Sequence, residues 1–102
     1  MIISSAQAAE LLKNDGVFLL DVREVSEYQN GHLEAAVLIP YDSLAFNADK
    51  LPSDKNTTIL VYCHSGRRSN IAAKELVKMG YTKVFDFGGI IDWQGKVVVT
   101  DK

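Results

Sequence analysis

The sequence predicts an α/β protein built around a mainly parallel sheet. Apolar segments with strand character alternate along the chain with segments whose apolar residues recur at helical spacing. The segment at 17–22 is almost entirely apolar, as expected of a strand covered on both faces of a parallel sheet. The segment at 58–62 leads through a short polar turn into an amphipathic helix. Because the chain has 102 residues, we expect one compact domain, 1–102, with helices flanking the sheet.

Local signals give the boundaries of these elements. Ser4 or Ser5 can cap the first helix, and Asp42 can cap a small one. Pro40 ends a short strand, and Gly80 ends the long amphipathic helix. The predicted helices span about residues 5–14, 24–30, 42–46, 69–79 and 90–94, with a surface loop at 47–58. The predicted strands are 17–22, 36–39, 58–62, 84–87 and, at an edge, 97–100.

Composition and charge exclude several functional classes. The net charge of −2 includes no basic excess, which argues against nucleic acid as the main partner. A single cysteine cannot form an internal disulfide. No apolar run approaches the length that spans a membrane, and the N-terminus lacks the pattern of a signal peptide. We therefore expect a cytoplasmic protein with no membrane partner, or a periplasmic one if a signal peptide has been removed.

The candidate active site is the turn between the third predicted strand and the long helix. Backbone N–H groups of such a turn and of the first helical turn converge on one point and favour an anion there. The group at that point is the thiol of Cys63, and a helix N-terminus with two nearby arginines favours its thiolate form. Cys63 is the predicted catalytic residue. The predicted anion-binding loop comprises His64, Ser65, Gly66, Arg67, Arg68 and Ser69.

Two further loops are expected near Cys63, because function gathers at the carboxyl ends of parallel strands. Asp21 and Arg23 end one strand, and Gly88 and Gly89 follow another. Asp21 and Arg23 are predicted to support the site together with Glu27, as a charge network that holds the strand end and the next helix. The alternative is that these three residues form an acid–base set.

Several side chains near the loop have two possible roles. His64 is predicted to be an exposed loop residue, although it can also orient a substrate, and one of Arg67 and Arg68 is expected to face only solvent. Ser69 can donate to the sulfur or cap the helix. His32 has no partner at metal-ligand spacing, so we expect it to be structural and expect no metal site. Tyr28 and Trp93 are predicted to be packing residues.

Three groups of residues, in this order and spacing, resemble the signatures of the rhodanese-like family in its single-domain form. The first comprises 19–24 with Glu27-Tyr28, 31–33, Ala36 and 39–40; the second is 61–68; the third comprises Leu76, 80–81, Val84, 88–89 and Trp93. The sequence departs from the family at Ala35, where the family usually has glycine, and at Glu34, where proline is frequent.

The resemblance implies a compact α/β domain with a central five-stranded parallel sheet, and it implies sulfur transfer. A small anionic donor such as thiosulfate, or a polysulfide, gives sulfane sulfur to Cys63, and the persulfide passes it to an acceptor. The acceptor is cyanide in vitro and a thiol or a protein in the cell. No cofactor is expected, and the chain is expected to be a monomer or a homodimer.

Two other functions use similar features. A cysteine-dependent phosphatase or arsenate reductase also holds a thiolate in an anion-binding loop, but its arginine usually lies six residues after the cysteine, where this chain has Ser69. A non-catalytic interaction domain or sulfur carrier of the same family is the other alternative. A thioredoxin-like role is disfavoured because the chain has no C-x-x-C pair.

Overall fold

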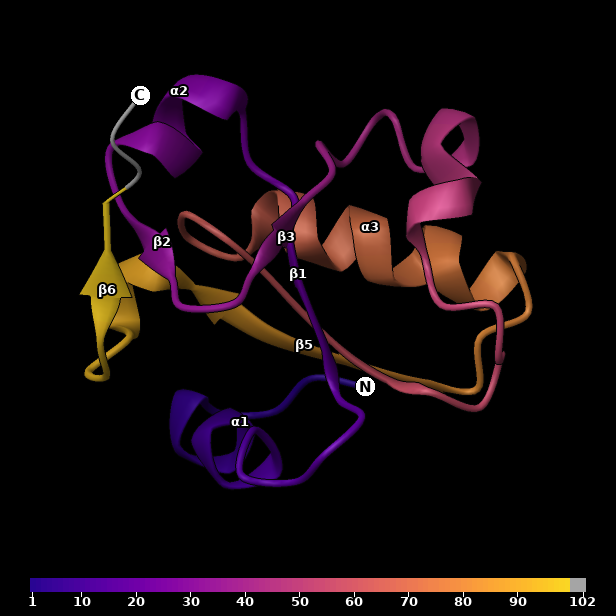
Figure 1. Cartoon of the computed structure of the whole chain (residues 1–102), viewed down its shortest axis with the longest axis horizontal. Helices are drawn as coiled ribbons and strands as arrows, with labels where there is room; N and C mark the ends of the chain where they lie inside the picture. The colour runs from indigo at the N-terminus through magenta and orange to yellow at the C-terminus, as the bar shows by residue number, and fades with distance from the viewer. Residues whose placement is uncertain (100–102) are drawn as a thin grey trace.

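A parallel sheet with the strand order β3–β1–β4–β5 forms the centre of the molecule (Figure 1). The computed structural model describes residues 1–99. The strands of the sheet are β1 (Phe18–Asp21), β3 (Val37–Leu38), β4 (Thr58–Cys63) and β5 (Lys83–Gly89). Every pairing among them is parallel. The predicted α/β class with a mainly parallel sheet is therefore confirmed.

The sheet has four full strands where five were expected, and the N-terminal segment occupies a fifth position beside β5. Ile2 forms an isolated parallel bridge with Asp86. The backbone N–H of Ile3 donates to the carbonyl of Asp86 at 2.9 Å, and the N–H of Asp86 donates to the carbonyl of Met1 at 2.8 Å. These three residues are too few to form a regular strand, and the strand prediction did not include them.

The C-terminal edge strand was expected in the main sheet, and this expectation was wrong. β6 (Val97–Val98) pairs antiparallel with β2 (His32–Leu33) and forms a separate two-stranded sheet. The end of the predicted strand, Thr100, lies outside the described residues. β2 was not predicted because a strand of two residues is too short to show an alternating pattern.

The helices cover both faces of the main sheet. α3 (Arg67–Lys78) lies on one face and α1 (Ser5–Leu11) lies on the other (Figure 1). Two buried clusters correspond to these faces. Alternate residues of β4 enter each cluster: Val61 and Cys63 pack on the α3 side, and Leu60 and Tyr62 on the α1 side. Burial on both faces explains why these strands are apolar throughout.

The start of α1 confirms one predicted cap. Ser4 caps the helix: its Oγ accepts from the N–H of Gln7 at 3.1 Å, while the N–H of Ser4 donates to Oε1 of Gln7 at 2.9 Å. This reciprocal pair satisfies two N–H groups that the helix itself cannot.

The remaining short helices are α2 (Val25–Gln29) and the 3₁₀ helices η1 (Ala45–Lys50) and η2 (Ile90–Asp92). The small helix expected at 42–46 was misplaced. Asp42 does not cap it, because η1 begins after Leu44 and continues into the predicted loop. Two buried leucines, Leu44 and Leu51, anchor the ends of η1 to the core. The burial of these two residues determines the position of the helix more than the capping signal does.

Candidate active site

Cys63 is the last residue of β4, and its thiol lies at the start of α3. The side chain is buried on the α3 side of the sheet, with 1% of its surface exposed. The backbone N–H of Gly66 donates to Sγ of Cys63 at 3.0 Å. α3 begins at the next residue, Arg67, and is 12 residues long. The sulfur is therefore close to the positive end of a helix, as the sequence predicted.

Two glycines make this turn possible. Gly66 has φ +112°, a left-handed conformation that side-chain-bearing residues rarely adopt, and this conformation lets its N–H face the sulfur. Gly89, at the end of β5, packs directly against the loop. A Cβ atom at Gly89 would overlap the carbonyl oxygen of His64. The ends of β4 and β5 therefore fix the position of the loop together.

Ser69 has neither of the two roles that we considered for it. The residue is buried, and its hydroxyl donates to Oδ1 of Asp86 at 2.6 Å. The N-cap residue of α3 is Gly66 and not Ser69, so no side chain caps the helix. Because its proton is engaged by a carboxylate, the Ser69 hydroxyl does not donate to Sγ. The Ser69 side chain therefore supplies no donor to Sγ, and the place of Ser69 in the anion-binding loop stays a prediction.

Asp86 is a residue that the sequence reasoning missed. The same oxygen, Oδ1, also accepts from the N–H of Gly88 at 2.9 Å, so the carboxylate connects the start of α3 to the end of β5. The available signal was an acidic residue in the middle of the otherwise apolar strand at 84–87. A carboxylate buried at such a position needs hydrogen-bond donors close by.

Arg68 does not face the thiol as an unpaired cation. Its guanidinium donates to both carboxylate oxygens of Glu27, at 2.7 and 2.9 Å. This bidentate bond to Arg68 lowers the pKa of Glu27 from 4.5 to about 2, and it raises the pKa of Arg68. The pair connects α2 to the first turn of α3. Glu27 is thus part of a charge network, but its partner is Arg68.

The outer part of the loop is open to solvent. His64, Ser65 and Arg67 are all exposed, which agrees with the prediction for His64. Within residues 1–99, Arg67 takes part in no ion pair. Of the two arginines, Arg67 is therefore the one whose charge is uncompensated.

Asp21 and Arg23 form a buried ion pair. Nε and Nη2 of Arg23 donate to the Asp21 carboxylate at 3.0 and 2.8 Å. The hydroxyl of Tyr62 donates to Oδ2 of Asp21 at 2.7 Å and accepts from the N–H of Leu33 at 3.1 Å. Burial, and next the Asp21 charge, raise the pKa of Tyr62 well above its usual range. All these polar groups satisfy one another, which is the requirement for burying them.

This ion pair lies on the sheet face opposite the thiol. Asp21 is aligned with Tyr62 in the parallel pairing of β1 and β4, so the two side chains share a face. Cys63 follows Tyr62 and points to the other face. The arrangement supports the predicted structural network, in which Asp21 and Arg23 hold the end of β1. It does not bring an acid–base set to the sulfur.

The other predicted structural residues lie near this network. Nδ1 of His32 is 2.9 Å from the carbonyl oxygen of Tyr28, and the two rings stack with centroids 3.7 Å apart. Trp93 packs against Phe87. No group of three or more potential metal ligands occurs among residues 1–99. In the same part of the chain, none of the helices combines the length and apolar character needed to cross a membrane.

The chain thus has a parallel α/β sheet with a cysteine at the end of a strand, close to a helix N-terminus that favours negative charge at its sulfur. Residues 4–96 match the rhodanese-like domain family, and the chain belongs to that family.

The chain is similar to curated proteins of two kinds, thiosulfate sulfurtransferases and a putative sulfur carrier protein. PspE of Escherichia coli, a thiosulfate sulfurtransferase, is 40% identical over 73 residues, which cover 72% of this chain and 70% of PspE. GlpE of Coxiella burnetii, also a thiosulfate sulfurtransferase, is 31% identical and is matched over 97% of this chain and 92% of its own length. YrkF of Bacillus subtilis, a putative sulfur carrier protein, is 39% identical over 81% of this chain. The chain spans only 44% of YrkF.

Solved structures agree with the fold. A rhodanese with anions from E. coli superposes with a TM-score of 0.77 at 36% identity, covering 82% of this chain and 99% of that one. A rhodanese-like domain protein from Staphylococcus aureus gives a TM-score of 0.83 at 26% identity, with 98% of both chains covered. The relatives' names support sulfur transfer as the chemistry of the family.

Proposed function

We propose that this chain is a sulfurtransferase that carries sulfane sulfur as a persulfide on Cys63. The observation that carries the proposal is the contact between the Gly66 N–H and Sγ of Cys63 at the start of α3. This contact and the helix terminus favour a sulfur anion at this position. Thiosulfate is the donor that the names of PspE and GlpE suggest.

In the first half-reaction, the Cys63 thiolate attacks the outer sulfur of thiosulfate. A new S–S bond forms to Sγ, the S–S bond within thiosulfate breaks, and its electron pair leaves with sulfite. Arg67 is exposed beside the loop and meets the sulfonate end of the donor. The reacting form is the thiolate, which attacks the donor without a separate general base.

In the second half-reaction, an acceptor nucleophile attacks the outer sulfur of the persulfide. Cys63 leaves as a thiolate, and cyanide becomes thiocyanate or a thiol becomes a persulfide. A persulfide extends about 2 Å beyond Sγ, which brings the reacting sulfur towards the surface from a buried cysteine. The same N–H group that contacts the resting sulfur stabilises the departing thiolate.

The test is intact-mass spectrometry before and after thiosulfate, with Cys63→Ser beside the wild type. We expect the wild type to gain one sulfur atom, Cys63→Ser to gain none, and cyanide to remove the added sulfur. Circular dichroism of Cys63→Ser confirms that the domain is folded. Loading of the serine variant, or no loading of the wild type by either thiosulfate or polysulfide, refutes the proposal.

A sulfur carrier is a second candidate, favoured by the similarity to the putative carrier protein YrkF. A carrier uses the same persulfide but passes its sulfur to a partner protein. The two candidates differ in turnover: a sulfurtransferase makes thiocyanate from thiosulfate and cyanide over many cycles. A carrier loads once and discharges slowly to cyanide.

A further inference from the structure

A cavity of about 330 Å³ lies beside α3 on the same side of the sheet as the thiol. Its lining residues come from the connection between β3 and η1, from the start of η1 and from the outer side of α3. They are Tyr41, Asp42, Leu44, Ala45, Ile71 and Glu75. Figure 1 shows the chain after β3 passing over α3 on its way to η1. Tyr41 also packs against the buried cluster that contains Cys63.

The cavity is close to the reacting sulfur along two paths. The N–H of Tyr41 donates to the carbonyl of Val22 at 3.1 Å, and the N–H of Val22 donates to the carbonyl of Tyr62 at 3.1 Å. Two strand spacings, about 10 Å, therefore separate Tyr41 from the end of β4. Along α3, Arg67, Ile71 and Glu75 follow one another at four-residue spacing on one side of the helix. Eight residues of helix span about 12 Å.

We call the surface that runs from Arg67 past Ile71 to the cavity the strip. The sign of its charges changes with distance from the thiol. Arg67 is exposed beside Cys63, whereas the cavity carries the carboxylates of Asp42 and Glu75. Neither carboxylate takes part in an ion pair within residues 1–99. Between the two ends lies Ile71, with 42% of its surface exposed. The strip is thus cationic near the sulfur, apolar in the middle and anionic at the cavity.

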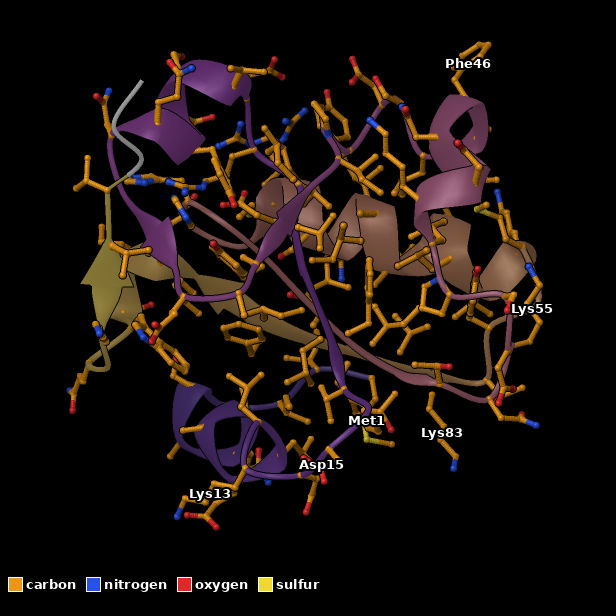
Figure 2. The ribbon with its side chains drawn as sticks, in the orientation of Figure 1. Met1, Lys13, Asp15, Phe46, Lys55 and Lys83 are labelled. Carbon is orange, nitrogen blue, oxygen red and sulfur yellow. The ribbon has the colours of Figure 1, made fainter. Side chains whose placement is uncertain are left out.

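An exposed aromatic side chain lies next to a cavity residue in the sequence. Phe46 follows the cavity residue Ala45 and is 89% exposed. Figure 2 shows its ring pointing away from the body of the molecule, at the η1 end. Exposed aromatic residues are enriched at protein–protein interfaces, where they supply contact area at low entropic cost. A solvated phenylalanine beside an acidic cavity favours a protein partner over a small thiol.

We propose that this strip is the docking surface for a protein sulfur acceptor, whose segment carries a cysteine and, about three residues away, a basic residue flanked by apolar ones. An extended segment covers about 3.3 Å per residue, so three residues bridge the distance from Cys63 to the cavity. The acceptor thiolate lies at the Arg67 end, and the basic residue lies between Asp42 and Glu75. The inference rests on the proposed function and names its acceptor class.

The transfer step is the second half-reaction with a protein thiolate as nucleophile. That thiolate attacks the outer sulfur of the Cys63 persulfide, and one S–S bond forms as the other breaks. Cys63 leaves with the electron pair as a thiolate, and the acceptor becomes the persulfide. No oxidant or reductant is needed.

The experiment measures how fast Cys63 persulfide discharges to two synthetic peptides, each with one cysteine. In the first, a lysine with a leucine on each side lies three residues after the cysteine; in the second, glutamate replaces the lysine. The variant is Asp42→Asn/Glu75→Gln, which keeps the shapes of both side chains. The matched control is Glu10→Gln/Asp15→Asn, which removes the same charge on the far side of the sheet, where Asp15 is labelled in Figure 2. Cyanide serves as an acceptor that needs no docking surface.

We expect the lysine peptide to react about fivefold or more faster than the glutamate peptide at low salt, and this preference to fade at high salt. The Asp42→Asn/Glu75→Gln variant should lose the preference and keep the wild-type rate with cyanide. The control variant should retain the preference. Equal rates for the two peptides, or a preference that survives in Asp42→Asn/Glu75→Gln, would overturn the docking proposal.

A binding measurement separates this inference from the proposed function. Fluorescein-labelled peptides with serine in place of cysteine are titrated with unloaded protein, and anisotropy gives the dissociation constants. We expect tighter binding of the lysine peptide, lost in Asp42→Asn/Glu75→Gln. If Cys63 fails to load but this binding preference is present, the surface stands and the sulfurtransferase proposal fails. If Cys63 loads and discharges to cyanide without any peptide preference, the sulfurtransferase proposal stands and the docking surface fails.

Discussion

At the scale of single residues, the loop divides its two arginines between different tasks. Arg68 is held by both oxygens of Glu27, whereas Arg67 is exposed and free of ion pairs within residues 1–99. The sequence predicts that one of these two adjacent arginines faces only solvent, but it does not indicate which one. The difference arises from Glu27, which lies 41 residues away from Arg68 in the chain.

Arg67→Ala should therefore slow sulfur loading from thiosulfate about tenfold, the effect of removing one charge-assisted contact worth about 1.4 kcal/mol at a partly solvated site. Arg67→Lys should recover part of the rate, because it restores the charge without the planar fork of donors. The measurement is the initial rate of persulfide formation against thiosulfate concentration. An unchanged rate in Arg67→Ala would exclude contact between Arg67 and the donor.

Ala35 is a second residue whose environment has a measurable consequence. It is the only non-glycine residue with positive φ within residues 1–99, at φ +70°. A residue with a Cβ pays roughly 1–2 kcal/mol in this conformation. Ala35→Gly should raise the free energy of unfolding by about 0.5–1 kcal/mol, since greater freedom of the unfolded glycine offsets part of the relief.

Urea denaturation checks this prediction, with Ala9→Gly as the control. Ala9 lies inside α1, so its replacement should lower stability by about 1 kcal/mol. If the urea midpoint rises in Ala35→Gly and falls in Ala9→Gly, the result supports a strained conformation at Ala35. A loss of stability in both variants would contradict it.

At the scale of elements, the Glu27–Arg68 pair joins α2 to α3 and makes stability depend on pH. Its hydrogen bonds to Arg68 lower the pKa of Glu27 from 4.5 to about 2 in the folded protein. A carboxyl group with a lowered folded pKa stabilises the protein above its unfolded pKa. This contribution should be complete above about pH 5 and disappear as the pH falls towards 2.

The measurement compares the free energies of unfolding of wild type and Glu27→Gln between pH 7 and pH 2. Their difference should be constant above about pH 5 and shrink below pH 4.5. Taking the difference cancels the titration of the other carboxylates. A pH-independent difference would mean that the amide variant loses packing and not the ion pair.

The sequence predicts the elements whose own residues carry the signal. β1, β4 and α3 are each recognisable because they are buried along their whole length or along one helical face. β2 and β6 have two residues each, and their pairing depends on a contact between residues 32–33 and 97–98. η1 is positioned by the burial of Leu44 and Leu51. Such contacts are set by tertiary structure, which local propensity does not encode.

In the candidate site, too, the features set by local sequence were predictable and those set by tertiary contacts were not. Cys63 and the glycine turn were predictable, since a strand end, a glycine and a helix start lie within one short segment. The partners of Arg68 and Ser69 were not, because Glu27 and Asp86 come from other parts of the chain. Only the folded sheet brings their carboxylates to the first turn of α3.

At the scale of the whole molecule, the sheet separates the reactive thiol from a buried hydrogen-bond network that stabilises the fold. The thiol, α3 and the acidic cavity lie on one face, and the Asp21–Arg23–Tyr62 network lies on the other. Tyr62 is fully buried, and its hydroxyl satisfies both Oδ2 of Asp21 and the N–H of Leu33. Tyr62→Phe preserves the aromatic ring but removes the acceptor of the Leu33 N–H, whereas Oδ2 of Asp21 keeps its two hydrogen bonds from Arg23.

Tyr62→Phe should therefore lower the free energy of unfolding by about 1–3 kcal/mol, the cost of leaving the buried N–H of Leu33 unpaired. The rate of persulfide formation per folded molecule should stay within about twofold of wild type, because Cys63 points to the opposite face. Urea denaturation and thiosulfate loading on the same samples separate the two effects. A fall of tenfold or more in loading, with stability unchanged, would reverse the assignment and make the network part of the chemistry.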